Sequence, residues 1–162
     1  MRRGYTVEQY RQLITKIRSK IPGIALSTDV IVGFPSESEQ QFQQTVNLLA
    51  ELRFDTVHVA AYSPRPGTIA SRKFEDNVPP AEKRGRLQKI EQLQGKIATE
   101  INAQLLGKTV EVLVGGKKKG KWQGRTQSGK LVFFTDNGDC LGQLVKIRIE
   151  KTSPWSLQGR VL

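Results

Sequence analysis

The order of apolar and polar positions divides the chain into a first part with helical and buried-strand patterns and a second part with a period of two. Apolar residues recur every three or four positions over residues 10–17 and 42–49, which predicts two amphipathic helices. Apolar runs follow them at residues 24–34 and 55–62 and predict two buried parallel strands, joined by right-handed crossovers. Two strands are too few to close a parallel barrel.

Local signals place the ends of the predicted helices. Thr6-Val7-Glu8-Gln9 and Ser36-Glu37-Ser38-Glu39 have the capping-box pattern, in which two side chains satisfy backbone N–H groups at a helix start. A third and longer helical pattern runs from Val78-Pro79-Pro80 to about Leu106, and Gly107 is predicted to stop it as a C-cap. We therefore place the boundary between two domains, 1–106 and 107–162, at this glycine.

After the boundary, apolar and polar residues alternate. Five short strands separated by Gly, Lys, Asn and Asp predict a small antiparallel five-stranded β-barrel of the oligonucleotide-binding kind. The fold class is thus α/β, the C-terminal portion of a parallel (β/α) barrel followed by this small barrel. The predicted strands are Thr109–Val114, Lys121–Thr126, Lys130–Thr135, Leu144–Glu150 and Ser156–Leu162.

Charge separates the two domains further. The 162 residues carry a net charge of +11, of which the 11 basic and 4 acidic residues after position 106 supply +7. Such an excess in a small module indicates a polyanionic partner, although a solvated surface is the alternative. Apolar runs are shorter than the roughly 18 residues of a membrane span, and a single cysteine agrees with a reducing compartment. We expect a cytoplasmic monomer that does not bind membranes.

Two ionisable side chains interrupt the predicted buried strands. Alternation places Asp29, Ile31 and Gly33 on one face of the first strand, and His58 lies on the second strand. A carboxylate in an apolar strand is costly unless a polar group meets it. Asp29 therefore either faces the lumen of a barrel or is a structural acid bonded to nearby donors. We interpret His58 as a barrel histidine rather than a ligand or base.

The loop Tyr62-Ser63-Pro64-Arg65-Pro66-Gly67-Thr68 holds an arginine between two prolines. An arginine on a stiff loop binds a phosphate or carboxylate with a smaller loss of conformational entropy. Arg65 is therefore a candidate substrate contact, with a purely structural role in the loop as the alternative.

A lysine-rich turn lies between the first two strands of the second domain. With nearby cations and an aromatic ring, it has the composition of a surface that binds single-stranded nucleic acid. Lysines in such a turn also form solvated tips without a ligand. The candidate RNA-binding residues are Lys117, Lys118, Lys119, Lys121, Trp122, Arg125 and Lys130.

Together these motifs resemble the radical S-adenosylmethionine methylthiotransferases, and most closely the branch that acts on tRNA. In the first domain the likeness rests on Ser27–Pro35 and on the loop Tyr62–Thr68. In the second domain, Gly124-Arg125-Thr126 and Ser156–Arg160 resemble the TRAM domain of RNA-modifying enzymes. The likeness runs from about Arg3 to the end of the chain.

The resemblance implies a fold and a function. Residues 1–106 would be part of a radical-SAM barrel with its long C-terminal helix, and residues 107–162 a TRAM domain that binds a tRNA anticodon stem-loop. Asp29, Ile31 and Gly33 would back the adenine of S-adenosylmethionine, although this family often has glycine at the first of these positions. The parent enzyme would add a 2-methylthio group to isopentenyladenosine beside the anticodon.

The family's Cys-x-x-x-Cys-x-x-Cys motif is not in this chain, whose single cysteine is Cys140. The parent's [4Fe–4S] clusters would therefore depend on an N-terminal part, and we expect this chain to have no catalytic or metal-ligating residues and to be inactive alone. Two alternatives remain at this stage. One is the branch that modifies an aspartate of a ribosomal protein, and the other is a non-catalytic basic RNA-binding protein.

Overall fold

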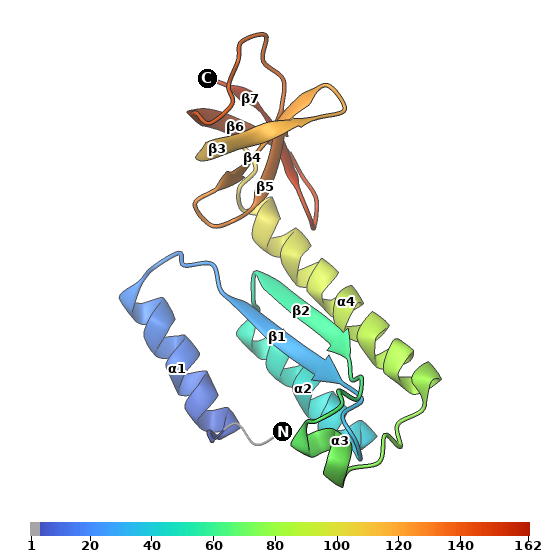
Figure 1. The fold of residues 1–162 in the computed structure, drawn as a ribbon. Coiled ribbons are helices and arrows are strands. Elements are labelled where there is room, and N and C mark those ends of the chain that lie inside the picture. The colour runs from blue at the N-terminus through green and yellow to red at the C-terminus, as the bar shows by residue number, and fades with distance from the viewer. Residues whose placement is uncertain (1–3) are drawn as a thin grey trace. The chain divides into compact units, whose positions relative to one another are not determined.

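The computed structural model describes residues 4–162, so the start of the family resemblance at Arg3 lies outside the described part. Contacts divide the chain into two units (Figure 1). The first unit ends at Gln94 and the second runs from Gly95 to Leu162, so that α4 (Pro80–Ala103) contributes to both. No helix among residues 4–162 has both the length and the apolar composition needed to cross a membrane.

The first unit contains two parallel strands in register from Ser27 and Thr56 onward. Its core lies on one face of this sheet, where Val32 packs with Phe42, Phe54 and Ile90. The other face is largely exposed, which differs from the expected cover on both faces. The elements are α1 (Val7–Lys20), β1 (Ser27–Val32), α2 (Glu39–Leu52), β2 (Thr56–Ala61), α3 (Ile69–Lys73) and the first part of α4.

The first predicted capping box is confirmed, and the second is displaced by two residues. Thr6 and Gln9 satisfy each other's backbone N–H groups at the start of α1. At α2 the reciprocal pair is Ser38 and Gln41 instead of Ser36 and Glu39. Ser36 has a φ of 66°, in the left-handed region, whereas an N-cap residue takes an extended conformation.

The second unit is a closed five-stranded barrel with strand order β3-β4-β5-β7-β6. Its core contains Val112, Val132, Phe134 and Ile147, all at most 2% exposed. All five strands overlap their predicted ranges, but β3 continues four residues beyond its predicted end and takes Lys117 and Lys118 out of the expected turn. The observed strands are β3 (Thr109–Lys118), β4 (Lys121–Thr126), β5 (Leu131–Phe134), β6 (Leu144–Thr152) and β7 (Leu157–Val161).

The expected antiparallel barrel needs one correction. Strand β5 pairs with β7 in parallel, whereas the other four pairings around the barrel are antiparallel. Strand directions cannot alternate all the way around a closed ring with an odd number of members. A five-stranded barrel that closes must therefore contain a parallel pair, and this barrel is mixed.

Two glycines allow neighbouring strands of the barrel to approach closely. A β-carbon at Gly124 would overlap the backbone of Leu113, and one at Gly159 would overlap the backbone of Arg148. Close packing of adjacent strands thus explains why Gly124 and Gly159 are glycines.

Candidate functional site

A pocket of about 790 Å³ lies at the carboxyl ends of β1 and β2. Ile31 and Ala60 lie on the sheet side, Arg65 comes from the proline-flanked loop, and Ile69 and Lys73 come from α3. The carboxyl ends of parallel strands are where α/β proteins commonly bind ligands. Ile31 and Arg65, both candidates from the sequence motifs, line this pocket.

Three aromatic rings form one wall of the pocket. The ring of Phe34 meets that of Tyr62 edge-on at a centroid distance of 5.1 Å and that of Phe74 at 6.0 Å. Edge-to-face packing at these distances is favourable. The wall thus joins residues that follow β1, β2 and α3 into one rigid surface.

Lys83 of α4 contacts Tyr62 of this wall and is only 7% exposed. Its Nζ donates to both carboxylate oxygens of Asp76, at 2.5 and 2.7 Å, and to the carbonyl oxygen of Tyr62 at 3.2 Å. The same nitrogen lies 5.3 Å from the centroid of the Tyr62 ring. All three ammonium hydrogens can therefore be satisfied, as a buried lysine requires.

Arg86, one turn further along α4 and 3% exposed, holds the loop after β1. Its Nη1 donates to Glu37 Oε2 at 2.7 Å, and its Nη2 bonds to Glu82. The same Glu37 oxygen accepts the Gly33 N–H at 2.6 Å. Neither Lys83 nor Arg86 was predicted from the sequence. The Glu82–Arg86 spacing was visible as an i, i+4 pair, but the partnership with Glu37 spans 49 residues.

The three residues predicted to contact the cofactor occupy different environments. Ile31 lines the pocket. Asp29 is exposed on the open face of the sheet, in register with His58, and its carboxylate has no hydrogen-bond or ion-pair partner within residues 4–162. Gly33 is buried under the Lys83 side chain and is not among the residues that line the pocket.

The Arg65 side chain is exposed and has no ion-pair or hydrogen-bond partner in the described part of the chain. Its backbone carbonyl accepts the Thr68 hydroxyl at 2.9 Å, which closes the loop. The structural role in this loop thus belongs to the Arg65 backbone, and the guanidinium stays available for a ligand.

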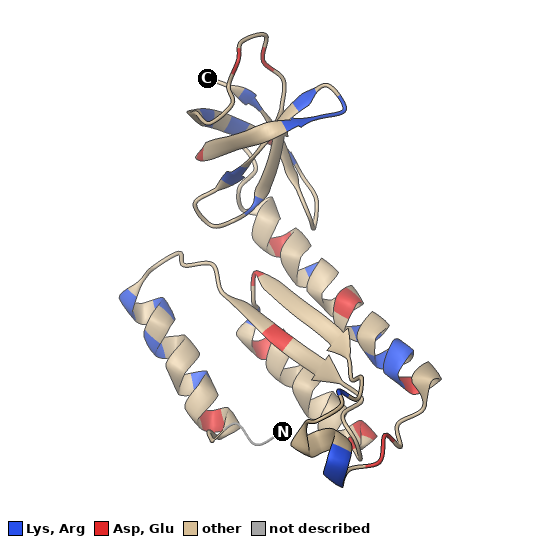
Figure 2. Ribbon diagram, viewed as in Figure 1, with Lys and Arg blue, Asp and Glu red and all other residues tan. Residues whose placement is uncertain are grey.

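In the second unit, four of the predicted lysines lie on the β3–β4 hairpin, and blue gathers at its tip in Figure 2. Lys118 pairs with Lys121, and the turn residues Lys119 and Gly120 both have positive φ, 50° and 79°. Positive φ at both positions matches the type I′ turn that joins twisted strands tightly. Lys117, Lys118, Lys119 and Lys121 are not buried by the barrel.

Trp122 requires a correction. We predicted that it contacts RNA, but only 5% of it is exposed and it belongs to the barrel core. The Lys117 ammonium lies over its ring at 4.0 Å from the centroid, a cation–π contact. Trp122 therefore supports the hairpin and is not a contact surface for RNA.

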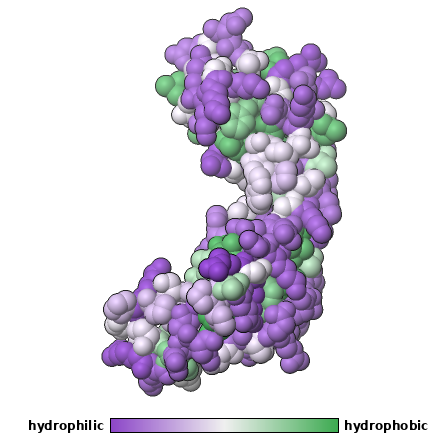
Figure 3. Space-filling view, turned by 90° about the vertical axis from the view of Figure 1, so that its right-hand side faces the viewer, coloured by the Kyte–Doolittle hydropathy of each residue, from purple (hydrophilic) through white to green (hydrophobic). Residues whose placement is uncertain are grey.

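The two remaining predicted cations, Arg125 and Lys130, differ in their exposure to solvent. Arg125 is exposed on β4, and its Nη1 donates to the carbonyl of Gly129 at 2.7 Å. Lys130 is half-buried immediately before β5. On the face of the molecule drawn in Figure 3, hydrophilic residues cover most of the barrel surface, with apolar residues between them.

The chain does not fit an iron–sulfur cluster. Such clusters are held mainly by three or four cysteine thiolates. The single cysteine of the chain, Cys140, is buried. Burial raises the pKa of its thiol, and the nearby Asp136 carboxylate acts in the same direction, so the thiolate that a cluster requires is disfavoured. Within residues 4–162, no group of three His, Cys, Asp or Glu side chains is placed to hold a metal ion.

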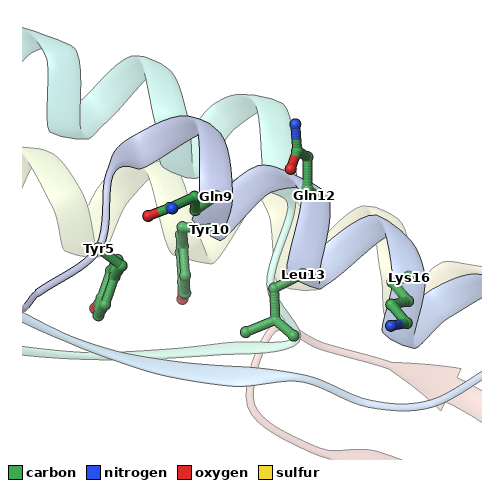
Figure 4. Close-up of a pocket in the computed structure, with 6 residues that line it drawn as sticks. All are labelled: Tyr5, Gln9, Tyr10, Gln12, Leu13 and Lys16. Atoms are coloured by element: carbon green, nitrogen blue, oxygen red, sulfur yellow. The ribbon is translucent and has the colours of Figure 1, made fainter.

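A second hollow, of about 460 Å³, lies along α1 and is drawn in Figure 4. Tyr10 points from the helix towards the sheet, where its hydroxyl pairs with that of Thr28 at 2.9 Å. The other lining residues are Tyr5, Gln9, Gln12, Leu13 and Lys16, none of which is a carboxylate or an imidazole. We assign no chemistry to this hollow.

Comparison with known proteins gives two findings. Residues 103–162 match the TRAM domain family. The chain is also similar over almost its whole length to proteins named tRNA-2-methylthio-N(6)-dimethylallyladenosine synthase. Identity is 57% to the protein of Chloroflexus aurantiacus, over 98% of this chain and 35% of that protein. Identity to the protein of Dehalococcoides mccartyi is 53%, over 100% of this chain and 39% of that protein. Identity to the Roseiflexus protein is 54%, over 98% of this chain and 34% of that protein.

These matches confirm the resemblance that the loop motifs and the TRAM-like glycines indicated. The chain spans little more than a third of the length of these relatives.

Proposed function

We propose that this chain is the tRNA-binding and pocket-forming part of a tRNA-2-methylthio-N(6)-dimethylallyladenosine synthase. The observation that carries the proposal is the identity of 53–57% to several such proteins along almost the entire chain, which includes both the pocket loops and the barrel. In this proposal, residues 4–94 supply two strands of a radical-SAM barrel and residues 95–162 supply the RNA-binding module.

Charge supports a role for the barrel in tRNA binding. The β3–β4 hairpin presents four lysines at the surface, and Arg125 lies exposed on β4, across from Leu113. Cations on a projecting hairpin neutralise phosphates without reading the base sequence. Such a module would hold the tRNA while the nucleotide to be modified is recognised elsewhere.

The pocket of the first unit supports that recognition. It combines an aromatic wall, apolar surface and two cations, Arg65 and Lys73, which suit a nucleotide with its phosphate. When bound, S-adenosylmethionine would supply the radical chemistry, and Ile31 is the predicted cofactor contact that reaches the pocket. The cluster that this chemistry needs finds no ligand set in the described part of this chain. We expect no turnover by the chain alone.

The salt dependence of tRNA binding tests the role of the hairpin. Each phosphate neutralised by a lysine releases condensed counterions and steepens the slope of log K against log salt. Changing Lys117, Lys118 and Lys119 together to alanine should flatten this slope by about two to three units. The affinity should be measured on one tRNA over a series of salt concentrations.

A matched variant controls for the loss of three charges. Lys16, Lys20 and Lys96 are also exposed, but they belong to α1 and α4 and not to the hairpin. Their joint change to alanine should leave the slope within about one unit of the unchanged chain. An equal slope in the two triple variants would reject the hairpin as the phosphate-binding element.

A further inference from the structure

Two large apolar side chains line the pocket without being buried by the protein. Ile69 is 65% exposed and Phe74 is 51% exposed, although both contribute to the same concave surface. Single exposed apolar residues are common, but two together on a pocket wall mark a binding surface for an apolar group.

Several other residues that line the pocket have small side chains. Ala60 and Ala61 end β2, and Ala70 lies beside Ile69 on α3. Small side chains here leave the room that a larger residue would fill. The cations Arg65 and Lys73 lie on the loop and on α3, so the pocket offers both an apolar surface and positive charge.

We infer that Ile69 and Phe74 determine specificity by contacting a branched alkyl group carried by the adenine of the target nucleotide. The inference rests on the proposed function, because a dimethylallyl group occurs in the name of the relatives' product. Ile69 and Phe74 receive the alkyl group, the Phe34 and Tyr62 rings flank the base, and Arg65 takes a phosphate.

The size of the effect follows from burial. One fully buried methylene-sized group favours binding by a factor of about four. Partial burial of a five-carbon group against the two side chains should therefore give about a tenfold preference for the alkylated over the unalkylated nucleotide.

The experiment compares two probes on the full 162-residue chain. N6-dimethylallyladenosine 5′-monophosphate and adenosine 5′-monophosphate are titrated separately, and binding is followed by NMR shifts of the chain. The wild-type chain should prefer the alkylated probe by about tenfold. Ile69→Asn should remove the preference by weakening only the alkylated probe, and Arg65→Ala should weaken both probes by the same factor.

Ile21 provides the matched control, because it is 53% exposed and lies outside the pocket at the end of α1. Ile21→Asn should keep the preference. Phe74→Ala should reduce it, as a second and independent variant.

Three results would overturn the inference: equal affinity of the wild-type chain for the two probes, an unchanged preference in Ile69→Asn, or no binding of either probe. None of them affects the salt-slope experiment, whose lysines lie on the barrel. Failure of this inference and failure of the proposed function are therefore distinguishable.

Discussion

The aliphatic part of the Lys83 side chain lies across Gly33 so closely that a β-carbon at Gly33 would overlap Lys83 Cγ. Gly33 also has a φ of 69°, which side chains with a β-carbon rarely adopt. Its amide is held by Glu37 and the Lys83 ammonium is held by Asp76 and Tyr62. Lys83 thus connects α4 to the end of β1 through Gly33 and to the end of β2 through Tyr62.

Gly33→Ala should destabilise the first unit by about 3 kcal/mol or more, the sum of the left-handed backbone cost and the steric overlap. Gly23→Ala isolates the first of these costs, because Gly23 has a φ of 77° but no atom lies within 4 Å of where its β-carbon would be. It should cost only about 1–2 kcal/mol. Urea unfolding of both variants measures the difference, and equal losses would show that Lys83 moves aside freely.

Lys83→Met should destabilise the first unit by about 2–3 kcal/mol, because it keeps the aliphatic stem but leaves the Asp76 carboxylate and the Tyr62 carbonyl without their donor. The side chains of this pair are 9% and 28% exposed. The reference is Arg11→Met, which breaks an ion pair with Glu51 whose side chains are 38% and 50% exposed. Since solvent screens that pair, its loss should change the urea midpoint much less. A similar shift in both variants would contradict the supporting role of Lys83.

Elements that depend on neighbouring residues could be predicted from the sequence. The Thr6 capping box and the five barrel strands rest on spacing within a few positions, and the structure contains all of them, although β3 runs on to Lys118. Ser36 misled the prediction, because its left-handed backbone is imposed by the loop after β1 and not by local preference.

The candidate site depended more on long-range contacts. The pocket residues Ile31 and Arg65 were identifiable because they belong to short motifs, whereas Lys83 and Arg86 act through partners far away in the chain. The Trp122 error was avoidable. With a period of two, Trp122 shares the inward face with Gly124, while Lys121 and Arg125 face outward, so composition alone was the wrong guide.

Trp122→Ala should destabilise the barrel by about 3–5 kcal/mol, as expected for a large aromatic side chain deleted from a core. Trp155→Ala is the comparison, because that ring is 63% exposed, and it should cost far less. Trp122→Phe should lie near the unchanged chain, since it removes an indole N–H that has no hydrogen-bond partner within residues 4–162. Thermal unfolding distinguishes the three. An unchanged barrel stability in Trp122→Ala, together with weaker tRNA binding, would restore the prediction that Trp122 contacts RNA.

Cys140 should react slowly with thiol reagents in the folded chain. Burial raises the pKa of its thiol, with the Asp136 carboxylate next in size, so that less thiolate is present at neutral pH than in the unfolded chain. The raised pKa also means that the folded barrel holds this proton more tightly. That contribution to stability is complete below the unfolded-state pKa and is lost as the pH rises through the folded-state value.

The reaction of Cys140 with an aromatic disulfide reagent, followed against pH, tests this prediction. In the folded chain the half-maximal rate should occur at a higher pH than in urea. Asp136→Asn should move the folded profile towards lower pH, because it removes the negative charge that disfavours the thiolate. Asp29→Asn, which changes an exposed carboxylate of the first unit, should leave the profile in place. Identical profiles for the folded and unfolded chains would show that the barrel opens around Cys140 faster than the reagent attacks it.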